Sequence, residues 1–297
     1  MTILALDLPS RRRNSRRNLA PAFGLSPAGL MLVLFFAMPM GMMIGTSFHD
    51  SSSGALSFQA YERLLSDGLT LTGFWRTTVM SCLVAVAATA LAFPPAYFLA
   101  RSKSRFRIIV LALALAPELA GVVLRTYGWL IILEDRGFIN DILLHWGVIA
   151  EPLSLSKNLF AVVVGLTHVV LPFAVLSLTT SIQGIDQNLE RAAQMLGANR
   201  LSVIRMILVP LSVPGIVSAL LLSFTMAASA YATPALLGGA GFKVLATMIS
   251  EQVLFYVDWP FAAVMANALL ILMLIVSYAG LNVEKRLRDK RDAKQRG

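Results

Sequence analysis

The sequence predicts an all-α membrane protein with six transmembrane helices and a further helix on the cytoplasmic side. Two features of the composition indicate this class: 57% of the 297 residues are hydrophobic, and only 14% are charged. The third observation is that the apolar residues gather into six long blocks, with a mean hydropathy of +0.73. Soluble domains carry about 25% charged residues, so an ordinary water-soluble enzyme is excluded.

The six spans are each long enough to cross the hydrocarbon core, which takes about 20 apolar residues. They are residues 28–48, 77–100, 107–132, 159–181, 213–235 and 261–283. Because these stretches are apolar on every side, they predict helices rather than the alternating strands of a barrel. The first span is too long for a signal peptide, and we expect it to remain as a helix that bends near Pro39.

Lysine and arginine residues predict the orientation, because positive residues favour cytoplasmic loops. Most of them fall on one side of the predicted membrane, at 11–17, 101–107, 191–205 and 285–296. Both termini are therefore expected in the cytoplasm. The net charge of +9 follows this distribution, so it indicates topology and not nucleic-acid binding. The chain divides into a basic leader (1–26), a transmembrane domain (27–284) and a basic tail (285–297).

The connections on the opposite side, 49–76, 133–158 and 236–260, are too short to form folded domains. The first predicts a short amphipathic helix at the membrane surface, because apolar residues recur there at helical spacing: Phe58, Tyr61, Leu64 and Leu65. No soluble catalytic module is expected.

Three ionisable residues lie within the spans: Glu118, Arg125 and His168. A charge in the hydrocarbon core is costly, so each is expected to face a partner or a water-filled cavity. Glu118 and Arg125 are seven residues apart, about two turns of one helix, and should share a face. They form either a structural pair or part of a solute pathway. For His168 we expect a hydrogen bond between packed helices.

Cys82 is the single cysteine, which excludes an internal disulfide and any CxxC metal or redox site. We expect it to be a small buried hydrophobic side chain. An intramembrane enzyme would need a nucleophile with a base, or a metal cluster, within the spans. One cysteine and one histidine provide neither, so no catalytic, cofactor-binding or metal-binding residue is expected.

The segment between the fourth and fifth spans, 182–212, predicts two short helices joined by a turn. Asp186 can cap the first helix, because its carboxylate can accept the free N–H groups of the first turn. Gly197 suits the end of that helix, where φ is positive, and Pro210 is expected to close the second. The first helix has an apolar face with i, i+3, i+4 and i+7 spacing: Leu189, Ala192, Ala193 and Leu196. Such a face either packs on its own bundle or docks into a groove of another protein.

This segment resembles the coupling loop of the membrane subunit of an ATP-binding cassette (ABC) importer. That loop carries Glu-Ala-Ala, three residues, Gly, nine residues and Ile-x-Leu-Pro, which matches Ala192-Ala193, Gly197 and Ile207-Leu208-Val209-Pro210 here. Two positions depart from it: Arg191 stands where the family has glutamate, with Glu190 one place earlier, and Val209 replaces leucine. The resemblance implies a contact with an ATPase for Glu190, Arg191, Ala192, Ala193, Gly197 and Pro210.

Further motifs are similar to the spermidine/putrescine branch of these permeases and cover most of the chain from the first span to the last. They are residues 125–129 (RTYGW), 137–140 (GFIN), 171–173 (LPF), 234–239 (PALLGG) and 258–260 (DWP). The resemblance implies the bundle of a type I importer permease, which spans the inner (plasma) membrane of a bacterium several times.

The permeases of this family do not hydrolyse ATP themselves. The resemblance implies a second, similar permease, expected to form a heterodimer with this chain, two cytoplasmic ATPase subunits and a periplasmic solute-binding protein. The chain has no G-x-x-x-x-G-K-[ST] phosphate loop. ATP with Mg²⁺ is therefore expected on the partner ATPases and no cofactor on this chain, which otherwise contacts membrane lipid.

The resemblance favours a polyamine such as spermidine or putrescine as the solute, while opines, amino-acid derivatives and other small organic solutes stay open. A polyamine would meet carboxylates and aromatic faces. The candidate pathway residues are Glu118, Arg125, Tyr127, Trp129 and Tyr231. Trp129 equally suits an aromatic belt at the membrane surface. An ATP-independent secondary transporter is a further alternative, although it predicts inverted repeats that the sequence does not convincingly show.

Overall fold

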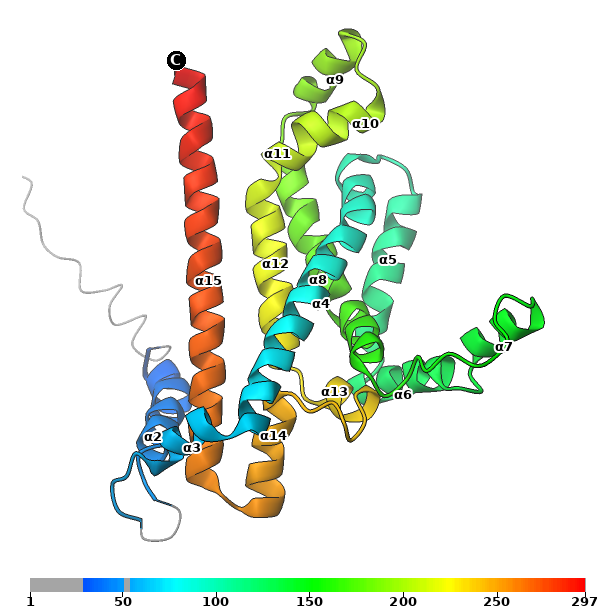
Figure 1. Cartoon of the computed structure of the whole chain (residues 1–297). Helices are drawn as coiled ribbons and strands as arrows, with labels where there is room; N and C mark the ends of the chain where they lie inside the picture. Colours follow the sequence, from blue (N-terminus) through cyan, green and yellow to red (C-terminus); the bar gives the residue numbers. More distant parts are fainter. Residues whose placement is uncertain (1–28, 51–53, 297) are drawn as a thin grey trace, which may run out of the picture. The chain divides into compact units, whose positions relative to one another are not determined.

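The computed structural model describes residues 29–50 and 54–296, and this part of the chain is almost entirely helical (Figure 1). Two compact units can be separated, residues 1–45 and 46–297. Near the start of the described chain, the π-helical turn η1 (Val33–Ala37) leads into α2 (Met38–Thr46). Pro39, at the start of α2, lacks the N–H that a regular helix needs. The apolar helix Gly29–Thr46 confirms the first predicted span.

The second unit consists of helices joined by short turns. Their bounds are α3 (Gln59–Ser66), α4 (Gly68–Arg101), α5 (Phe106–Leu119), α6 (Val122–Leu133), α7 (Phe138–His145), α8 (Leu159–Gln183), α9 (Gln187–Met195), α10 (Arg200–Val203), η2 (Ile204–Leu208), α11 (Val209–Leu211), α12 (Val213–Ala228), α13 (Ala232–Leu237), α14 (Leu245–Glu251), η3 (Gln252–Tyr256) and α15 (Trp259–Arg296). Among the described residues, 4 helices are long and apolar enough to cross a membrane, and the number rises to 6 when each of two bent helix pairs is counted as one span.

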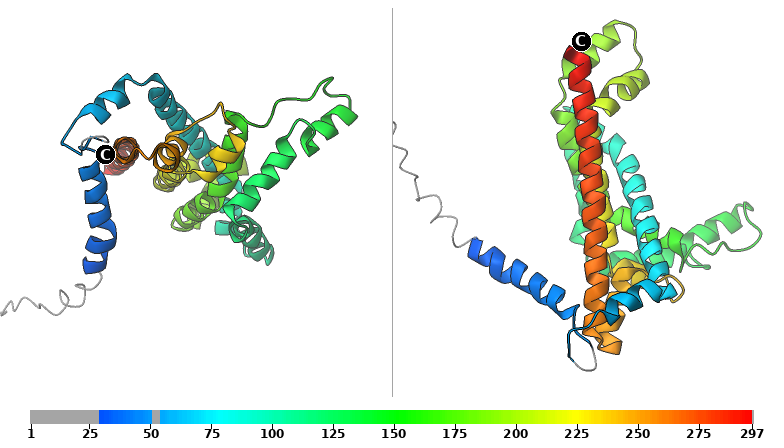
Figure 2. Two further views of the ribbon diagram at one scale, coloured as in Figure 1. Left: turned by 90° about the horizontal axis from the view of Figure 1, so that it is seen from below. Right: turned by 60° about the vertical axis from the view of Figure 1, so that its left-hand side comes forward.

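Helices α4, α8 and α12 form the core of this unit and lie side by side (Figures 1 and 2). Small side chains allow the close approach: Ala88, Ala92 and Ala96 of α4 and Ala174 of α8 are all fully buried. Such close backbone packing holds helices together in lipid, where the hydrophobic effect between helices is absent. Helix α15 packs against α12 and α14, while α6 and α7 extend sideways from the core (Figure 2).

At Gly215, α12 lies close against Ser181 of α8. A Cβ added there would lie 2.2 Å from the Cβ of Ser181. We expect Gly215→Ala to separate the helices and to lower the free energy of unfolding by about 1–3 kcal/mol, the usual cost of overpacking. Thermal unfolding in detergent measures the change. Gly128→Ala is the matched control, because a Cβ on that helical glycine meets nothing within 4 Å, and equal stability of the two variants would contradict the prediction.

The second span begins earlier than predicted, because α4 starts at Gly68 and not near residue 77. Asp67 caps the helix: its carboxylate accepts hydrogen bonds from the backbone N–H groups of Leu69 and Thr70, both at 3.2 Å. The Thr70 hydroxyl donates to the same carboxylate. This side-chain hydrogen bond is the largest cause that lowers the pKa of Asp67 below its usual value.

The third predicted span, 107–132, is not a single straight helix. The chain bends by 99° between α5 and the segment that begins with α6. Pro117 removes one backbone donor in the last turn of α5, and Ala120 and Gly121 then adopt extended ψ angles of 131° and 146°. Helix α5 therefore ends at Leu119, and α6 follows a new direction.

The fifth span is also shorter than predicted. Helix α12 ends at Ala228 rather than near residue 235, and α13 forms a separate short helix after it. At its other end, α12 is bent by 71° from the helix that runs from Arg200 to Leu211. That helix ends at Leu211, one residue after Pro210, close to the predicted end. Pro214 lies in the first turn of α12, where a missing N–H has no cost.

Two smaller expectations have opposite outcomes. The predicted amphipathic helix after the first span is confirmed as α3, Gln59–Ser66. The expectation that Cys82 is buried is wrong: its side chain is exposed on α4. The neighbouring Ser81 and Val84 are buried instead, so α4 presents Cys82 on the side that faces away from the α8–α12 core.

Candidate coupling and pathway sites

Helix α9 forms the predicted first half of the 182–212 segment. The Asp186 carboxylate accepts a hydrogen bond from the backbone N–H of Asn188 at 2.9 Å, as a helix cap should. At the other end, Gly197 has a φ of +88°, and the N–H of Ala198 donates to the carbonyl of Ala193 at 3.0 Å. These contacts satisfy backbone groups that a helix end leaves free. The helix, its cap and its glycine turn are therefore confirmed.

Most of the predicted apolar face of α9 is exposed, and only Ala193 of its four residues is half-buried. The exposed fractions are 47% for Leu189 and 89% for both Met195 and Leu196, and Ala192 is exposed as well. Water contact at so many apolar side chains on one short helix is typical of an interaction surface. We call Leu189, Ala192, Met195, Leu196 and Gly197 the α9 face.

The charged residues of α9 separate into two groups. Arg191 is exposed, whereas Glu190 is buried and turned toward the core. Its Oε1 atom lies 2.7 Å from Nε of Arg101, the last residue of α4. The resemblance implied a contact with an ATPase for Glu190, whereas the structure buries its side chain against Arg101. The sequence indicated Arg101 only as a topology signal. The distance between the two residues along the chain concealed the pair.

The candidate pathway residues Glu118 and Arg125 are brought together. Nη1 of Arg125 lies 3.0 Å from Oε1 of Glu118, so the two form an ion pair. The exposed fraction is 4% for the Arg125 side chain and 33% for that of Glu118. The reason given by the sequence, a shared face of one helix, is wrong, because the two residues lie on either side of the break between α5 and α6.

Trp129 and His168 form a second contact beside this ion pair. The indole Nε1–H of Trp129 donates to Nδ1 of His168 at 3.0 Å, and the two rings meet edge to face. The expected hydrogen bond of His168 between helices is therefore confirmed, and it fixes α6 to α8. Thr126 and Thr233 join α6 to α13 through their hydroxyl groups, 3.2 Å apart.

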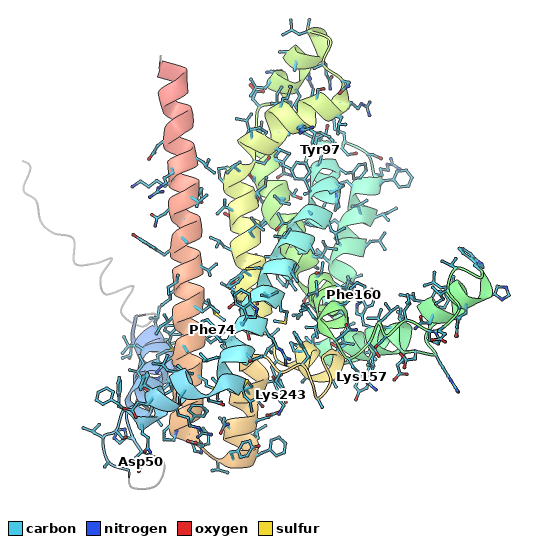
Figure 3. The ribbon with its side chains drawn as sticks, in the orientation of Figure 1. Asp50, Phe74, Tyr97, Lys157, Phe160 and Lys243 are labelled. Atoms are coloured by element: carbon cyan, nitrogen blue, oxygen red, sulfur yellow. The ribbon has the colours of Figure 1, made fainter. Side chains whose placement is uncertain are left out.

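The two candidate tyrosines are more exposed than this group of contacts. Tyr127 and Tyr231 are about half exposed, and they come from α6 and from the turn before α13. Tyr231 lines a cavity of ≈ 240 Å³ together with Lys243 and Glu251, which form an ion pair at 2.7 Å. Figure 3 shows Lys243 at the end of the bundle that carries α14, opposite α9.

Known proteins resemble this chain in sequence and in fold. A family profile described as "Binding-protein-dependent transport system inner membrane component" matches residues 96–289. The spermidine/putrescine transport system permease protein PotB of Escherichia coli (strain K12) is 36% identical over 247 residues, which are 82% of this chain and 90% of that protein. PotB of Salmonella typhimurium (strain LT2) is 34% identical over 270 residues, 88% of this chain and 94% of that protein.

Two solved structures share the fold. A bacterial ABC transporter involved in the import of the acidic polysaccharide alginate superimposes with a TM-score of 0.75 at 18% identity, over 91% of this chain and 96% of that chain. The MetNI methionine ABC transporter in an inward-facing conformation superimposes with a TM-score of 0.57 at 18% identity, over 74% of this chain and 96% of that chain.

Proposed function

Because this chain belongs to the family of binding-protein-dependent transport system inner membrane components, it is a permease subunit of an ABC importer, and we propose that it forms half of the translocation pathway for a polyamine. Relatives named as spermidine/putrescine permeases, at 36% and 34% identity over most of the chain, support that solute class. Glu118 near the α5–α6 break and the aromatic residues of α6 suit a cationic solute.

The proposed assembly contains a second, similar permease, two ATPase subunits and a periplasmic binding protein. ATP with Mg²⁺ would bind to the ATPases, and this chain would bind no cofactor. The observation that carries the proposal is the α9 face. This apolar helix surface is exposed instead of packed on the rest of the chain, and it ends at a glycine with a positive φ. A short helix of this kind can enter a groove on an ATPase.

The proposed topology places both termini and α9 in the cytoplasm. The C-terminal part of α15, the turn between α4 and α5, and α9 all lie at one end of the second unit (Figure 1). The basic residues of 101–107, 191–205 and 285–296 belong to these segments or, for Arg200 and Arg205, to α10 and η2, which follow α9. This agrees with the preference of positive residues for the cytoplasmic side. Helices α3 and α14 would then face the periplasm.

We expect a tagged chain, extracted from its native membrane in mild detergent, to bring down an ATPase with a phosphate loop and a second permease. Mass spectrometry of the recovered proteins measures this. Reconstitution of the recovered assembly with its binding protein should then give ATP-dependent uptake of spermidine or putrescine. Repeated recovery of the folded chain alone would contradict the proposed function and favour an ATP-independent transporter. Uptake of only other solutes would contradict the polyamine.

A further inference from the structure

Glu190 is a buried carboxylate in a helix that is otherwise mostly exposed. The residues on both sides of it, Leu189 and Arg191, are exposed, whereas the exposed fraction of the Glu190 side chain is 9%. Removing a charge from water is costly unless a partner of opposite charge replaces the water. The partner is Arg101, whose side chain is 11% exposed and whose Nε lies 2.7 Å from Oε1 of Glu190.

Arg101 contacts the coupling segment at two points. Besides Glu190 in the first turn of α9, its Nη2 atom donates to the backbone carbonyl of Ile185 at 2.9 Å. Ile185 comes directly before Asp186, the cap of α9. The extended guanidinium reaches both groups at once: Nε forms the ion pair with Glu190, and Nη2 donates the hydrogen bond to Ile185. The compact ammonium of lysine carries its charge at one point and cannot cover both positions. One side chain at the end of α4 therefore holds both the turn that enters α9 and the helix itself.

The end of α4 at which this contact occurs belongs to the core. Figure 3 shows Tyr97, about one helical turn before Arg101, at the same end of α4 as α9 and α10. Further along α4, Ala88, Ala92 and Ala96 are fully buried against the neighbouring helices. Helix α9 itself packs chiefly against α10. Apart from the chain connection to α8, the Arg101–Glu190 pair is therefore a direct link from α9 into the core.

We propose that Arg101 and Glu190 are positioning residues that fix α9 to the end of α4, so that a displacement of α9 by the ATPase moves α4 and the core packed on it. The inference rests on the proposed function, in which α9 docks to an ATPase. It gives the two sides of α9 different tasks: the α9 face binds the ATPase, and Glu190 on the other side transmits the movement. Packed helices with discrete arrangements can amplify such small displacements.

The test compares solute uptake per ATP hydrolysed in the assembled importer, reconstituted with its binding protein. In Arg101→Met, Glu190 stays buried without its counter-charge; in Glu190→Gln, the charge is removed at nearly constant shape. Both variants should still bring down the ATPase, because the α9 face is intact, and should still hydrolyse ATP. Uptake per ATP should fall about tenfold in Arg101→Met, because breaking a buried ion pair is strongly unfavourable, and less in Glu190→Gln.

The reversed pair, Arg101→Glu with Glu190→Arg, restores opposite charges but not the hydrogen bond to the Ile185 carbonyl. It should therefore regain uptake per ATP only to about the level of Arg101→Lys, a partial rescue that a loss of folding alone would not predict. Lys103→Met is the matched control: it removes a positive charge two residues further on, from an exposed side chain, and uptake should stay normal. If Arg101→Met does not accumulate in the membrane, uptake per ATP is measured in Arg101→Lys instead. This variant keeps the positive charge but loses the hydrogen bond to the Ile185 carbonyl, so its uptake per ATP should be reduced.

Two results would overturn the inference. One is normal uptake per ATP in Arg101→Met or, where that variant is absent from the membrane, in Arg101→Lys. The other is a loss of uptake that only follows a loss of ATP hydrolysis, so that the ratio stays constant. A failure of the proposed function would give a different result: the unaltered chain would then bring down no ATPase from the membrane.

Discussion

Replacing Gly197 with valine should leave ATP hydrolysis in place while solute uptake falls by about tenfold or more. Gly197 has a φ of +88°, and a side chain with Cβ in this left-handed region costs about 1–2 kcal/mol, with β-branched residues least tolerated. The turn must therefore deform, and the exposed Leu196 beside it loses its position. The added side chain also enlarges the α9 face where an ATPase groove would approach. Uptake and ATP hydrolysis in the reconstituted importer measure both effects.

Gly147→Val is the matched control for this prediction. Gly147 also has a positive φ, +66°. At both glycines, an added Cβ would have no other atom of this chain within 4 Å, apart from its immediate neighbours. The two variants therefore introduce similar backbone strain, but only one lies at α9. Gly197→Asn should retain more uptake than Gly197→Val, since asparagine tolerates this conformation. Normal uptake in Gly197→Val would show that α9 does not take part in the coupling mechanism.

Glu118→Ala should reduce polyamine uptake by about tenfold or more. The substitution leaves the guanidinium of Arg125 without its ion-pair partner in a site where its side chain is 4% exposed. A buried charge without a partner is strongly unfavourable, and a free positive charge beside the pathway would also repel a cationic solute. Initial rates of spermidine and putrescine uptake measure the change. Glu134→Ala, an exposed carboxylate at the other end of α6, is the control and should transport normally.

A double variant separates the structural role of this pair from a role in the pathway. Glu118→Leu combined with Arg125→Leu removes both charges, and an apolar pair of this kind often restores the stability that a single substitution loses. If the pair lines the pathway, thermal stability should recover in the double variant while uptake stays low. Recovery of both properties would show that the ion pair only holds α5 and α6 together. Unchanged uptake and selectivity in Glu118→Ala would exclude it from the pathway.

The short-range features of this protein could be read from the sequence. Helix α8, Leu159–Gln183, nearly coincides with the predicted span 159–181, because hydropathy and helix length are properties of adjacent residues. The cap and the turn of α9 were predicted for the same reason. Asp186 accepts a hydrogen bond from a backbone N–H only two residues away. Glycine is favoured at position 197 because the backbone φ of that residue is positive. A segment that makes its defining contacts within itself can be recognised without the rest of the fold.

Proline shows where sequence reasoning ends. Pro94, Pro95 and Pro172 lie inside the continuous helices α4 and α8, whereas α5 ends two residues after Pro117. The missing N–H is the same in every case, so the proline alone does not decide between a helix that continues and one that ends. The contacts of α6 with α8 and α13 hold the new direction after Pro117.

The sequence by itself determined the class of the protein, most of its membrane spans and the helix that carries the coupling motif. Only the tertiary structure decided the break between α5 and α6, the exposure of Cys82 and the side of α9 to which Glu190 points. The physical reason is the range of the interactions. Hydropathy, caps and turns act between neighbours in the chain, whereas the Arg101–Glu190 pair joins residues from separate helices, whose approach depends on how α4, α8 and α12 pack.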